Sequence, residues 1–474
     1  MAKFNTTPTN KTVNKEGHVA YKMHDKEKLI TQVLTSFFNE AKFYGDNSKE
    51  MKETIKSVIK QDPQFVSNLT VFARREFHMR SVSHVLTAYL AHEVEGKPYA
   101  RQTVRGVTLR GDDVTEIMAF YLSTFGKPIP NSLKKGIEDA MRGFDEYTLA
   151  KYKGGSKAVK MRDLLNLCRP KPTTAAQSEL WKKLLEDKLE TPYTWETELS
   201  AKGNTQETWE ALIDSGKVGY MAQLRNLRNI IQAKPSNLDK VLQYIANPEA
   251  VRRSKQLPFR FLSAYKELRG IGDSRVFDAL EDAAEAAIEN MPRLEGRTVI
   301  AVDTSGSMNG CISGNSTVRC SDIAWLLGLM ASKMCDSSIF YTFDGAIKQH
   351  AISRRNGILY TATTASSPGG TTEMYLPFQK MLQDGVQADR VIIISDNQCN
   401  GRRGIVQRYA DEYRHKSGND IWIHAIDLQG YGTQQFNGPK TNIIAGWSEK
   451  VFEFIKLAEQ GEGSLAKTIE EYTY

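Results

Sequence analysis

The sequence predicts a helical-repeat region followed by an α/β domain built on a parallel sheet. The pattern of apolar residues differs between two parts of the chain and indicates this division. Residues 18–290 show successive amphipathic helical patterns with no alternating strand pattern, whereas strand-like and helix-like runs alternate from residue 293 onwards. Pro292 and Gly296 mark a short linker between the two. We therefore expect one domain over residues 1–292 and a second over residues 293–474.

The helices of the first part follow from the spacing of apolar residues. The first is predicted by Leu29, Ile30, Val33, Leu34 and Phe37, which recur at helical intervals. The predicted helical runs are residues 26–44, 68–94, 113–126, 131–144, 161–170, 178–189, 205–216, 218–233, 238–247, 257–270 and 275–291. The second run is long enough for two helices with a break near Ser81. Many helices joined by short turns favour an α-solenoid of stacked helix pairs, with a compact all-α domain as the alternative.

The second part alternates strands with helices. The predicted strands are residues 297–303, 337–343, 390–396 and 420–426, and the predicted helices are residues 321–334, 373–384, 404–416 and 449–460. Strands that are apolar on both faces and alternate with helices are typical of a parallel sheet covered on both sides. Such sheets place their functional sites at the carboxyl ends of the strands.

Composition and cysteine usage narrow the class of protein. Of the 474 residues, 40% are hydrophobic and 25% charged, which is ordinary for a soluble globular protein. No run of 18 apolar residues is present, and the polar N-terminal stretch MAKFNTTPTNKTVNKEG lacks the apolar core of a secretory signal. The five cysteines are odd in number and contain no CxxC pair, which argues against disulfides and zinc. We expect a cytoplasmic protein without membrane contact.

The positive charge of the chain lies in its helical part. Residues 1–290 contain 45 Lys and Arg against 37 Asp and Glu, whereas residues 291–474 contain 18 against 19. Two interpretations of this excess stay open. It can reflect solvated helix faces, or it can form a phosphate-binding surface if the charges cluster on one face.

Oxygen-bearing side chains gather at the ends of two predicted strands. Asp303 ends the strand in VIAVDTSGSM and is followed by Ser305 and Ser307, while Asp396 ends VIIISD. The flexible stretch SSPGGTTEMYL between them supplies Thr371 and the adjacent Thr372. Oxygen ligands suit a hard cation, and we expect Mg²⁺, with Mn²⁺ or Ca²⁺ as alternatives. The other reading of DTSGS is that its polar residues only cap the following turn.

Motifs of common enzymes are absent from the sequence. It contains no G-x-S-x-G nucleophile elbow, no Walker A loop and no H-E-x-x-H zinc motif. A D-x-D phosphotransferase would need an aspartate at the position of Ser305. We therefore expect a binding protein rather than an enzyme and assign no catalytic residue.

The D-x-S-x-S, Thr and Asp pattern resembles the metal-ion-dependent adhesion site (MIDAS) of von Willebrand factor A domains. The resemblance implies a metal held by Asp303, Ser305, Ser307, Thr371 and Asp396, with Thr372 as the alternative to its neighbour. Because the hydroxyl ligands are neutral, the cation would stay short of negative charge and could accept an acidic group from a partner.

The helical part resembles the TROVE family, which comprises the Ro autoantigen and its bacterial relatives. NKEGHVAYKM, FARREFHMRSVSHVLTAYLA, MRDLLNLCRPKP, VGYMAQLRNLRNI and LPFRFLSAYKELR occur in this order before the A-like domain. The resemblance implies a ring of HEAT-like repeats in a ribonucleoprotein. Its outer surface would bind a small Y-like RNA, and its hole would take single-stranded 3′ ends of misfolded or decaying RNA. It also implies a role in RNA quality control and turnover with an exoribonuclease such as polynucleotide phosphorylase.

Basic residues within these motifs are the candidates for RNA contacts. For the Y-like RNA surface they are Lys134, Lys135 and Arg162; for the hole they are Arg74, Arg75, His78, Arg80, Arg225 and Arg228. Asn226, between the last two, is expected to be a buried packing or capping residue. The alternative function is a protein-adhesion module in which the metal site binds an acidic partner. The ring is expected from one chain, so we expect a monomer.

Overall fold

The computed structural model describes residues 11–14, 17–36, 49–155, 157–256, 258–289, 291–311, 316–353, 355–400, 404–431, 433–446, 451–460 and 465–474. The chain folds as two compact units. One, here the helical unit, contains residues 25–193 and 465–474; the other, here the sheet unit, contains residues 1–24 and 194–464. Within the described residues, no helix combines the length and apolar character needed to span a membrane.

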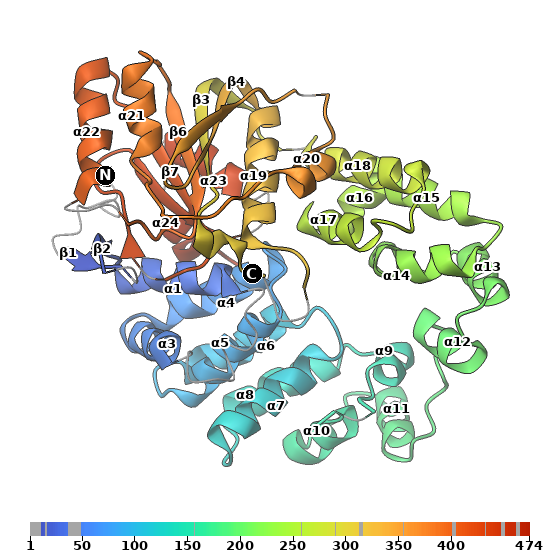
Figure 1. Cartoon of the computed structure of the whole chain (residues 1–474). Helices are drawn as coiled ribbons and strands as arrows, with labels where there is room; N and C mark the ends of the chain where they lie inside the picture. The colour runs from blue at the N-terminus through green and yellow to red at the C-terminus, as the bar shows by residue number, and fades with distance from the viewer. Residues whose placement is uncertain are drawn as a thin grey trace. The chain divides into compact units, whose positions relative to one another are not determined.

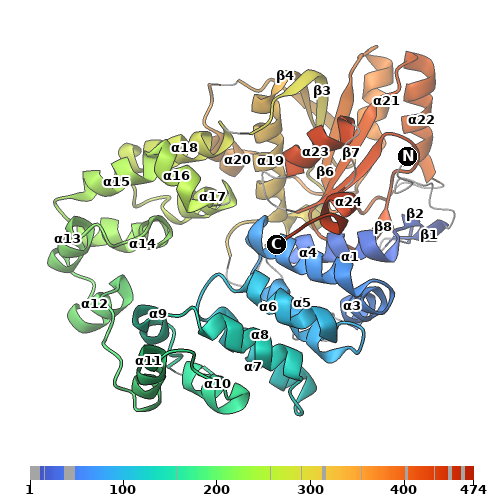
Figure 2. The same ribbon diagram turned by 180° about the vertical axis from the view of Figure 1, so that it is seen from behind.

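The helical unit consists of short helices stacked on their sequence neighbours (Figure 2). They are α1 (Asp25–Leu34), α3 (Lys49–Gln61), α4 (Pro63–Arg75), α5 (Ser81–His92), α6 (Lys97–Val107), α7 (Asp113–Phe125), α8 (Asn131–Met141), α9 (Glu146–Lys151), α10 (Met161–Cys168), α11 (Ala175–Leu185) and α24 (Leu465–Glu470). The predicted break near Ser81 is confirmed between α4 and α5. The predicted first helix ends at Leu34, and residues 37–48 lie outside the described residues.

Small residues allow the helices of this unit to approach closely. A Cβ atom on Gly106 of α6 would lie 2.6 Å from Cγ2 of Val71 on α4, and one on Gly136 of α8 would lie 2.7 Å from Cβ of Val104. The C-terminal segment packs into the same stack, where the Tyr474 hydroxyl lies 2.5 Å from Oγ of Ser67. Close packing of this kind defines the solenoid core, because each helix buries its apolar stripe against its neighbours.

The sheet unit combines further helices with two sheets. Its elements are β1 (Lys11–Val13), β2 (Val19–Lys22), α12 (Trp195–Lys202), α13 (Gln206–Asp214), α14 (Tyr220–Ala233), α15 (Leu238–Ala246), α16 (Pro248–Ser254), α17 (Pro258–Glu267), α18 (Ser274–Ile288), β3 (Leu294–Asp303), the 3₁₀ turn η4 (Gly306–Asn309), α19 (Cys320–Met334), β4 (Cys335–Phe343), β5 (Ile347–His350), α20 (Ile358–Thr364), α21 (Leu376–Gln383), β6 (Arg390–Ser395), α22 (Ile405–Ser417), β7 (Trp422–Asp427), β8 (Thr433–Gln434), β9 (Thr441–Ala445) and α23 (Val451–Glu459).

The larger sheet has the order β5-β4-β3-β6-β7-β9 and is parallel except for the edge strand β5. Val299 and Ala301 of β3 belong to a core that includes residues of α21 and α22, while α19 contacts β3, β4 and β6. Figure 1 shows α21 and α22 on one side of the sheet and α19 on the other. The predicted α/β architecture is therefore confirmed, and the carboxyl ends of β3 and β6 lie side by side.

Several elements of the structure were not among the predicted runs. The longest are the helices α3 and α6, which lie between predicted helical runs although their apolar residues recur at helical intervals. The other differences are short elements. Helices throughout residues 18–290 were expected, but Val19–Lys22 forms a strand that pairs with β1 and β8. The edge strand β5, the last strand β9 and helix α20 were not predicted either. Each spans only four to seven residues, which is too short for a clear hydrophobic period, so tertiary pairing decides its structure.

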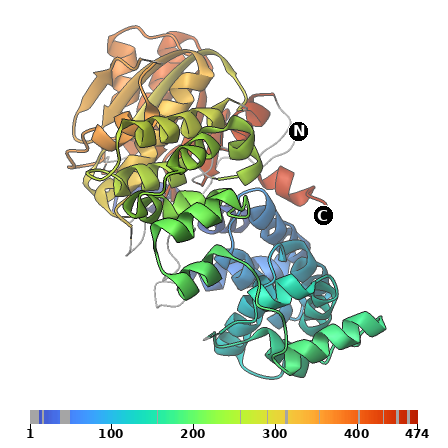
Figure 3. The ribbon, with the colours of Figure 1, turned by 90° about the vertical axis from the view of Figure 1, so that its right-hand side faces the viewer.

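Helix α20 joins the A-like domain to the preceding helices within the sheet unit. It contacts α17, α18 and α19, and Figure 1 shows it between α19 and α18; Figure 3 shows these yellow and orange segments from another side. The carboxylate of Glu281 on α18 accepts the main-chain N–H groups of Leu359 and Tyr360 at 3.1 and 2.7 Å. This acidic side chain accepts hydrogen bonds from N–H groups at the start of α20, and its negative charge interacts favourably with the dipole of the helix.

Candidate metal site and nucleic-acid interface

Asp303, Ser305 and Ser307 form one connected group at the end of β3. The main-chain N–H of Ser305 donates to Oδ1 of Asp303 at 2.8 Å, and the hydroxyl oxygens of the two serines lie 3.3 Å apart. Asp303 and Ser305 are fully buried, whereas Ser307 is exposed. The chain thus turns three oxygen-bearing side chains toward one edge of the sheet within five residues.

The glycine loop at residues 369–370 is fastened to this group through the main chain. The N–H of Gly306 donates to the carbonyl of Gly370 at 3.0 Å, and the N–H of Gly369 donates to the carbonyl of Thr304 at 3.1 Å. Gly370 has a φ of +116°, a conformation that side-chain-bearing residues rarely adopt. Glycine at this position therefore lets the loop that carries the candidate threonines reach the D-x-S-x-S turn.

The two candidate threonines differ in their surroundings. Thr371 is exposed, and its Oγ1 lies towards the turn at Gly345. Thr372 is 4% exposed, and its main-chain N–H and carbonyl are both bonded to Asn400. Both follow the glycine loop directly, so the choice between them as ligand stays a prediction.

Asp396 completes the set from the neighbouring strand. It is 1% exposed and directly follows Ser395, whose hydroxyl donates to Oδ2 of Asp303 at 2.6 Å. Burial and then the nearby charge of Asp396 raise the pKa of Asp303 well above its ordinary value, although hydrogen bonds from the two serines oppose this. The two buried carboxylates therefore lie close enough to repel each other.

This donor set fits a hard divalent cation. The described contacts of Asp303 come from a serine N–H and a serine hydroxyl, which do not neutralise its charge. Carboxylate and hydroxyl oxygens are the ligands that Mg²⁺, Mn²⁺ and Ca²⁺ prefer, and a cation would offset the repulsion between two buried carboxylates. The identity of the metal stays a prediction.

The candidates for the Y-like RNA surface lie on two helices that contact each other, α8 and α10. Lys135 is 57% exposed at its side chain and pairs with Glu138 at 2.7 Å. Lys134 is half-buried, and its charge acts on the thiol of Cys168 on α10. Arg162, near the start of α10, is exposed. The structure thus brings two helices that carry all three cations into one part of the helical unit.

Arg225 and Arg228 are both exposed on α14 of the sheet unit. Arg228 lies 3.9 Å from Glu267, a long ion pair between exposed groups. Burial lowers the pKa of Arg260 on the contacting helix α17, and the charge of Arg225 lowers it further. Asn226 is 5% exposed and donates to the carbonyl of Ala222, which confirms the expected buried role.

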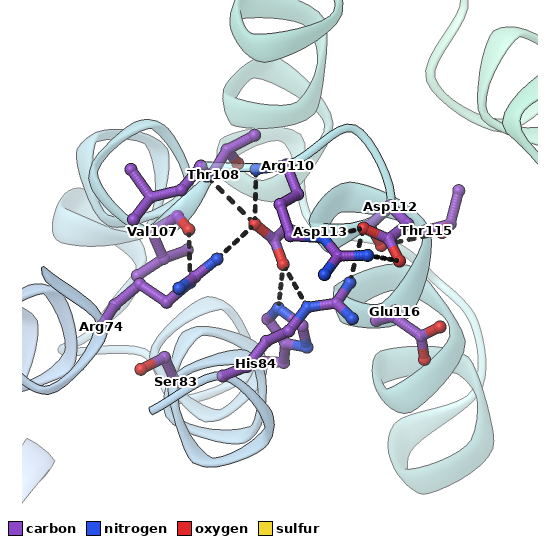
Figure 4. A network of polar contacts seen from close by, with 12 residues as sticks. Arg74, Ser83, His84, Val107, Thr108, Arg110, Asp112, Asp113, Thr115 and Glu116 are labelled. Carbon is purple, nitrogen blue, oxygen red and sulfur yellow. Dashed lines mark hydrogen bonds and ion pairs between the residues drawn. The ribbon is translucent and has the colours of Figure 1, made fainter. Parts of the chain in front are cut away.

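Of the other four candidates, Arg74 and Arg80 belong to a buried polar network in the helical unit, where Figure 4 shows Arg74 beside Asp113. Arg74 is 6% exposed and pairs with Asp113 of α7 at 3.0 Å, and Arg80 pairs with the same carboxylate at 2.7 Å. Arg75 donates to the carbonyl of Gly106 at 2.9 Å, and His78 has a φ of +55° in the turn between α4 and α5. Arg74 therefore stabilises the fold, and it is the least exposed of the four residues.

Asp113 accepts most of the hydrogen bonds of this network. Burial opposes its ionisation, but the hydrogen bond from His84 and the charges of Arg74 and Arg80 outweigh that effect and hold the pKa of Asp113 far below its ordinary value. Burial also lowers the pKa of His84, against the opposing hydrogen bond and charge of Asp113. The buried imidazole is therefore neutral at pH 7 and donates from Nε2.

Sequence reasoning missed three residues of these sites. Ser395 bonds to Asp303, Asn400 holds Thr372, and Arg260 lies beside Arg225. Ser395 could have been found, because it directly precedes Asp396 at the same strand end. Arg260 lay within the motif LPFRFLSAYKELR, but nothing in the sequence indicates which helix that motif contacts.

Comparison with known proteins places these features in a family. The family model for the TROVE domain matches residues 15–187 and 185–279, and the model for the Ro60 vWA domain matches residues 297–432. The crystal structure of the Deinococcus radiodurans RO (RSR) protein superposes with a TM-score of 0.58 at 18% identity, covering 85% of this chain and 93% of that one. At this identity the likeness shows the fold alone.

Curated relatives match this chain at similarly low sequence identity. Telomerase protein component 1 of Rattus norvegicus is 24% identical over 51% of this chain and 12% of its own length. The proteins named RNA-binding protein RO60 from Caenorhabditis elegans and D. radiodurans are 25% and 23% identical, over 48% and 46% of this chain. The match covers 38% and 44% of their lengths, so it spans less than half of each relative.

Proposed function

The chain belongs to the TROVE domain family, and from this premise we propose that it is an RNA-binding scaffold for noncoding RNA. Two relatives carry the name RNA-binding protein RO60, and the exposed cations of the helical unit supply the chemistry that RNA binding needs. Arg and Lys neutralise phosphates without reading sequence, so their contacts set the position of the RNA and make binding sensitive to salt.

The α8/α10 cations, Lys134, Lys135 and Arg162, are proposed to bind the backbone of a structured, Y-like RNA. The observation that carries this proposal is their placement on two contacting helices of the domain that the family model matches. Glu138 neutralises Lys135 only in part, because the same carboxylate group also accepts from Arg142 at 2.7 Å. Lys135 therefore keeps part of its charge for a phosphate, although α8 and α10 together hold as many acidic as basic residues.

Single-stranded 3′ ends of misfolded or decaying RNA are proposed to contact Arg225 and Arg228, with Arg260 as a neighbour. Two guanidiniums held close together repel each other, as the lowered pKa of Arg260 reflects after the effect of burial. A phosphate between them would relieve this repulsion, and a guanidinium plane can also stack on an unpaired base. Transfer of such ends to an exoribonuclease, of which polynucleotide phosphorylase is an example, would place the protein in RNA turnover in the cytoplasm.

Charge-removing variants test the α8/α10 proposal. The triple variant Lys134→Met, Lys135→Met, Arg162→Met is expected to bind a structured RNA about tenfold or more weakly at 0.1 M salt, since each lost contact removes one released counterion. The matched control is Lys49→Met, Lys56→Met, Lys60→Met, three exposed lysines on α3, which packs against α1, α4 and α5. Equal affinity of the two variants, measured by fluorescence anisotropy, would show that α8 and α10 do not contact the RNA.

The metal site supports a second proposal, that of an adhesion site for an acidic partner. Two buried carboxylates and adjoining hydroxyls lie at one sheet edge, where Asp303, Ser305, Ser307, Asp396 and Thr371 or Thr372 would hold Mg²⁺. A bound cation would offer a coordination position to a carboxylate from another molecule. This proposal requires no bond chemistry, and we expect no catalytic step at the site.

Thermal unfolding in Mg²⁺ tests whether a cation binds. Binding to the folded state alone stabilises by about 2.7 kcal/mol when the ion is at 100 times its dissociation constant. The wild-type protein is therefore expected to melt several degrees higher in Mg²⁺ than in EDTA, whereas Asp303→Ala should show no such increase. Asp384→Ala removes an exposed carboxylate of the same domain and is the control, which should keep the increase in melting temperature. A wild-type protein that does not respond to Mg²⁺, Mn²⁺ or Ca²⁺ would contradict the assignment.

A further inference from the structure

A pocket lies in the sheet unit, and none of its lining residues belongs to the Asp303 group. It has a volume of about 330 Å³ and is bordered by α19, the edge strand β5 and the segment that leads into α20. We call it the α19–α20 pocket. Leu329, Ile352 and Ile358 form its apolar wall, and Trp325 and Lys348 contribute polar groups. The volume lies at the lower end of the range for small-molecule sites.

Trp325 lines this pocket and carries a hydrogen-bond donor without an acceptor among the described residues. The residue is 4% exposed, and its ring stacks on Phe340 at 5.2 Å between centroids and meets His350 edge-on at 5.1 Å. These contacts fix the orientation of the indole. Its Nε1 atom is buried and has no acceptor among the described residues. A buried N–H without an acceptor is rare in folded proteins and calls for a partner.

The charged groups around the pocket favour an anion. Lys348 on β5 is exposed and forms no ion pair within the described part of the chain, whereas Lys333 is paired with Glu285. His350 shares a 2.8 Å hydrogen bond with Thr342, and burial and then the charge of Lys348 lower its pKa, so it is neutral at pH 7. Among the described residues, those that line the pocket include no carboxylate. One ammonium group is therefore left without a counter-charge.

We propose that the α19–α20 pocket binds a small organic anion. A carboxylate or phosphate oxygen of the ligand accepts the Trp325 N–H and faces Lys348, while its apolar body contacts Leu329 and Ile358. Hydrogen bonds to an ionised acceptor are the stronger kind, so the anionic group fixes the orientation of the ligand. None of the lining residues belongs to the Asp303 group or to the RNA candidates, so this inference goes beyond the proposed function and does not depend on it.

Indole resonances provide a direct test on the full-length protein. The chain contains six tryptophans, so selective ¹⁵N labelling gives one indole signal for each, and Trp325→Phe identifies the signal of interest. Phenyl phosphate and benzoate serve as anionic probes, and benzyl alcohol is the neutral probe of similar shape. Either anion is expected to shift the Trp325 indole signal in a saturable way, with benzyl alcohol binding about tenfold more weakly. The anion that binds more tightly shows whether the ligand's head group is a phosphate or a carboxylate.

Two lysine variants separate the proposal from unspecific binding. Lys348→Met is expected to weaken both anions about fivefold and to leave benzyl alcohol unchanged, because a partly exposed ion pair contributes modestly. Lys416→Met, an exposed lysine on α22, should change none of the three affinities. The proposal is wrong if neither anion shifts the Trp325 signal, if the neutral probe binds as tightly as the anions, or if Lys348→Met and Lys416→Met behave alike.

Discussion

The substitution Asp113→Asn is expected to loosen the helical unit around α4, α5 and α7. One oxygen of Asp113 accepts from Arg74 and from two main-chain N–H groups, at 2.9 to 3.0 Å, and the other accepts from Arg80 and His84, at 2.7 and 3.0 Å. An asparagine keeps one acceptor and replaces the other with an N–H₂ group. In either orientation, at least two donors therefore lose their acceptor.

The structure also indicates which orientation costs least. If the amide N–H₂ faces Arg80 and His84, the imidazole can change tautomer and Arg80 keeps its 2.8 Å pair with Asp112. Arg74, which is 6% exposed, then retains a hydrogen-bond acceptor but loses its counter-charge. Removing one partner of a buried ion pair costs about 3–5 kcal/mol, whichever orientation is adopted. The local opening free energy should fall by about this amount.

Hydrogen–deuterium exchange of peptides from α4, α5 and α7 measures this effect locally. A loss of about 3 kcal/mol corresponds to protection that falls about a hundredfold or more. The control is Asp187→Asn, because that carboxylate is 69% exposed and forms only a surface pair with Lys153, worth about 1 kcal/mol or less. Equal protection from exchange in the two variants would refute the structural role assigned to Asp113. Arg74 and Arg80 would then again be candidates for RNA contacts.

Three further predictions concern charged side chains. Glu459→Gln should destabilise the A-like domain by about 3 kcal/mol in urea unfolding, since Arg390 is 6% exposed at its side chain and pairs with Glu459 at 2.6 Å; a change below about 1 kcal/mol would contradict this. The stability of the helical unit should fall as pH drops below 6.5, because the pKa of His84 is lowered by burial and only the unfolded chain gains the proton there; His84→Gln should flatten the profile above pH 5. Arg225→Gln should reduce the salt slope of single-stranded RNA binding by about one, whereas Arg275→Gln, which already pairs with Asp239 and Asp273, should reduce it little.

Much of the fold could be predicted because most of its longer elements carry a clear hydrophobic period, although the helices α3 and α6 were not among the predicted runs. Strands β3 and β6 are apolar on both faces, as expected for the middle of a parallel sheet, and the turn residues near Ser81 separate α4 from α5. Elements of four to seven residues carry too few periods to be recognised. Strand β2 illustrates this, because Tyr21 and Lys22 pair with Gln434 and Thr433, more than 400 residues away in sequence.

The two candidate sites differ in how far sequence reasoning reaches. The Asp303 group could be predicted because D-x-S-x-S is local and because parallel strands end at one edge, which brings Asp396 near it. The stretch ARREFHMRS looks like an exposed basic segment, yet Arg74 is buried because Asp113, 39 residues later, supplies its counter-charge. Pairing between residues so far apart leaves no local pattern, so burial of this arginine could not be inferred.

The RNA-scaffold proposal is tested by binding of a structured RNA with and without a single-stranded 3′ tail, across a salt series. The tail is expected to strengthen binding, and the logarithm of the affinity is expected to fall steeply and linearly with the logarithm of the salt concentration, because several phosphates are neutralised. The α8/α10 triple variant is expected to lose affinity for both RNAs, while Arg225→Gln reduces the advantage of the tail. Absence of binding to either RNA at low salt would contradict the scaffold function and turn attention to acidic partners of the Asp303 group.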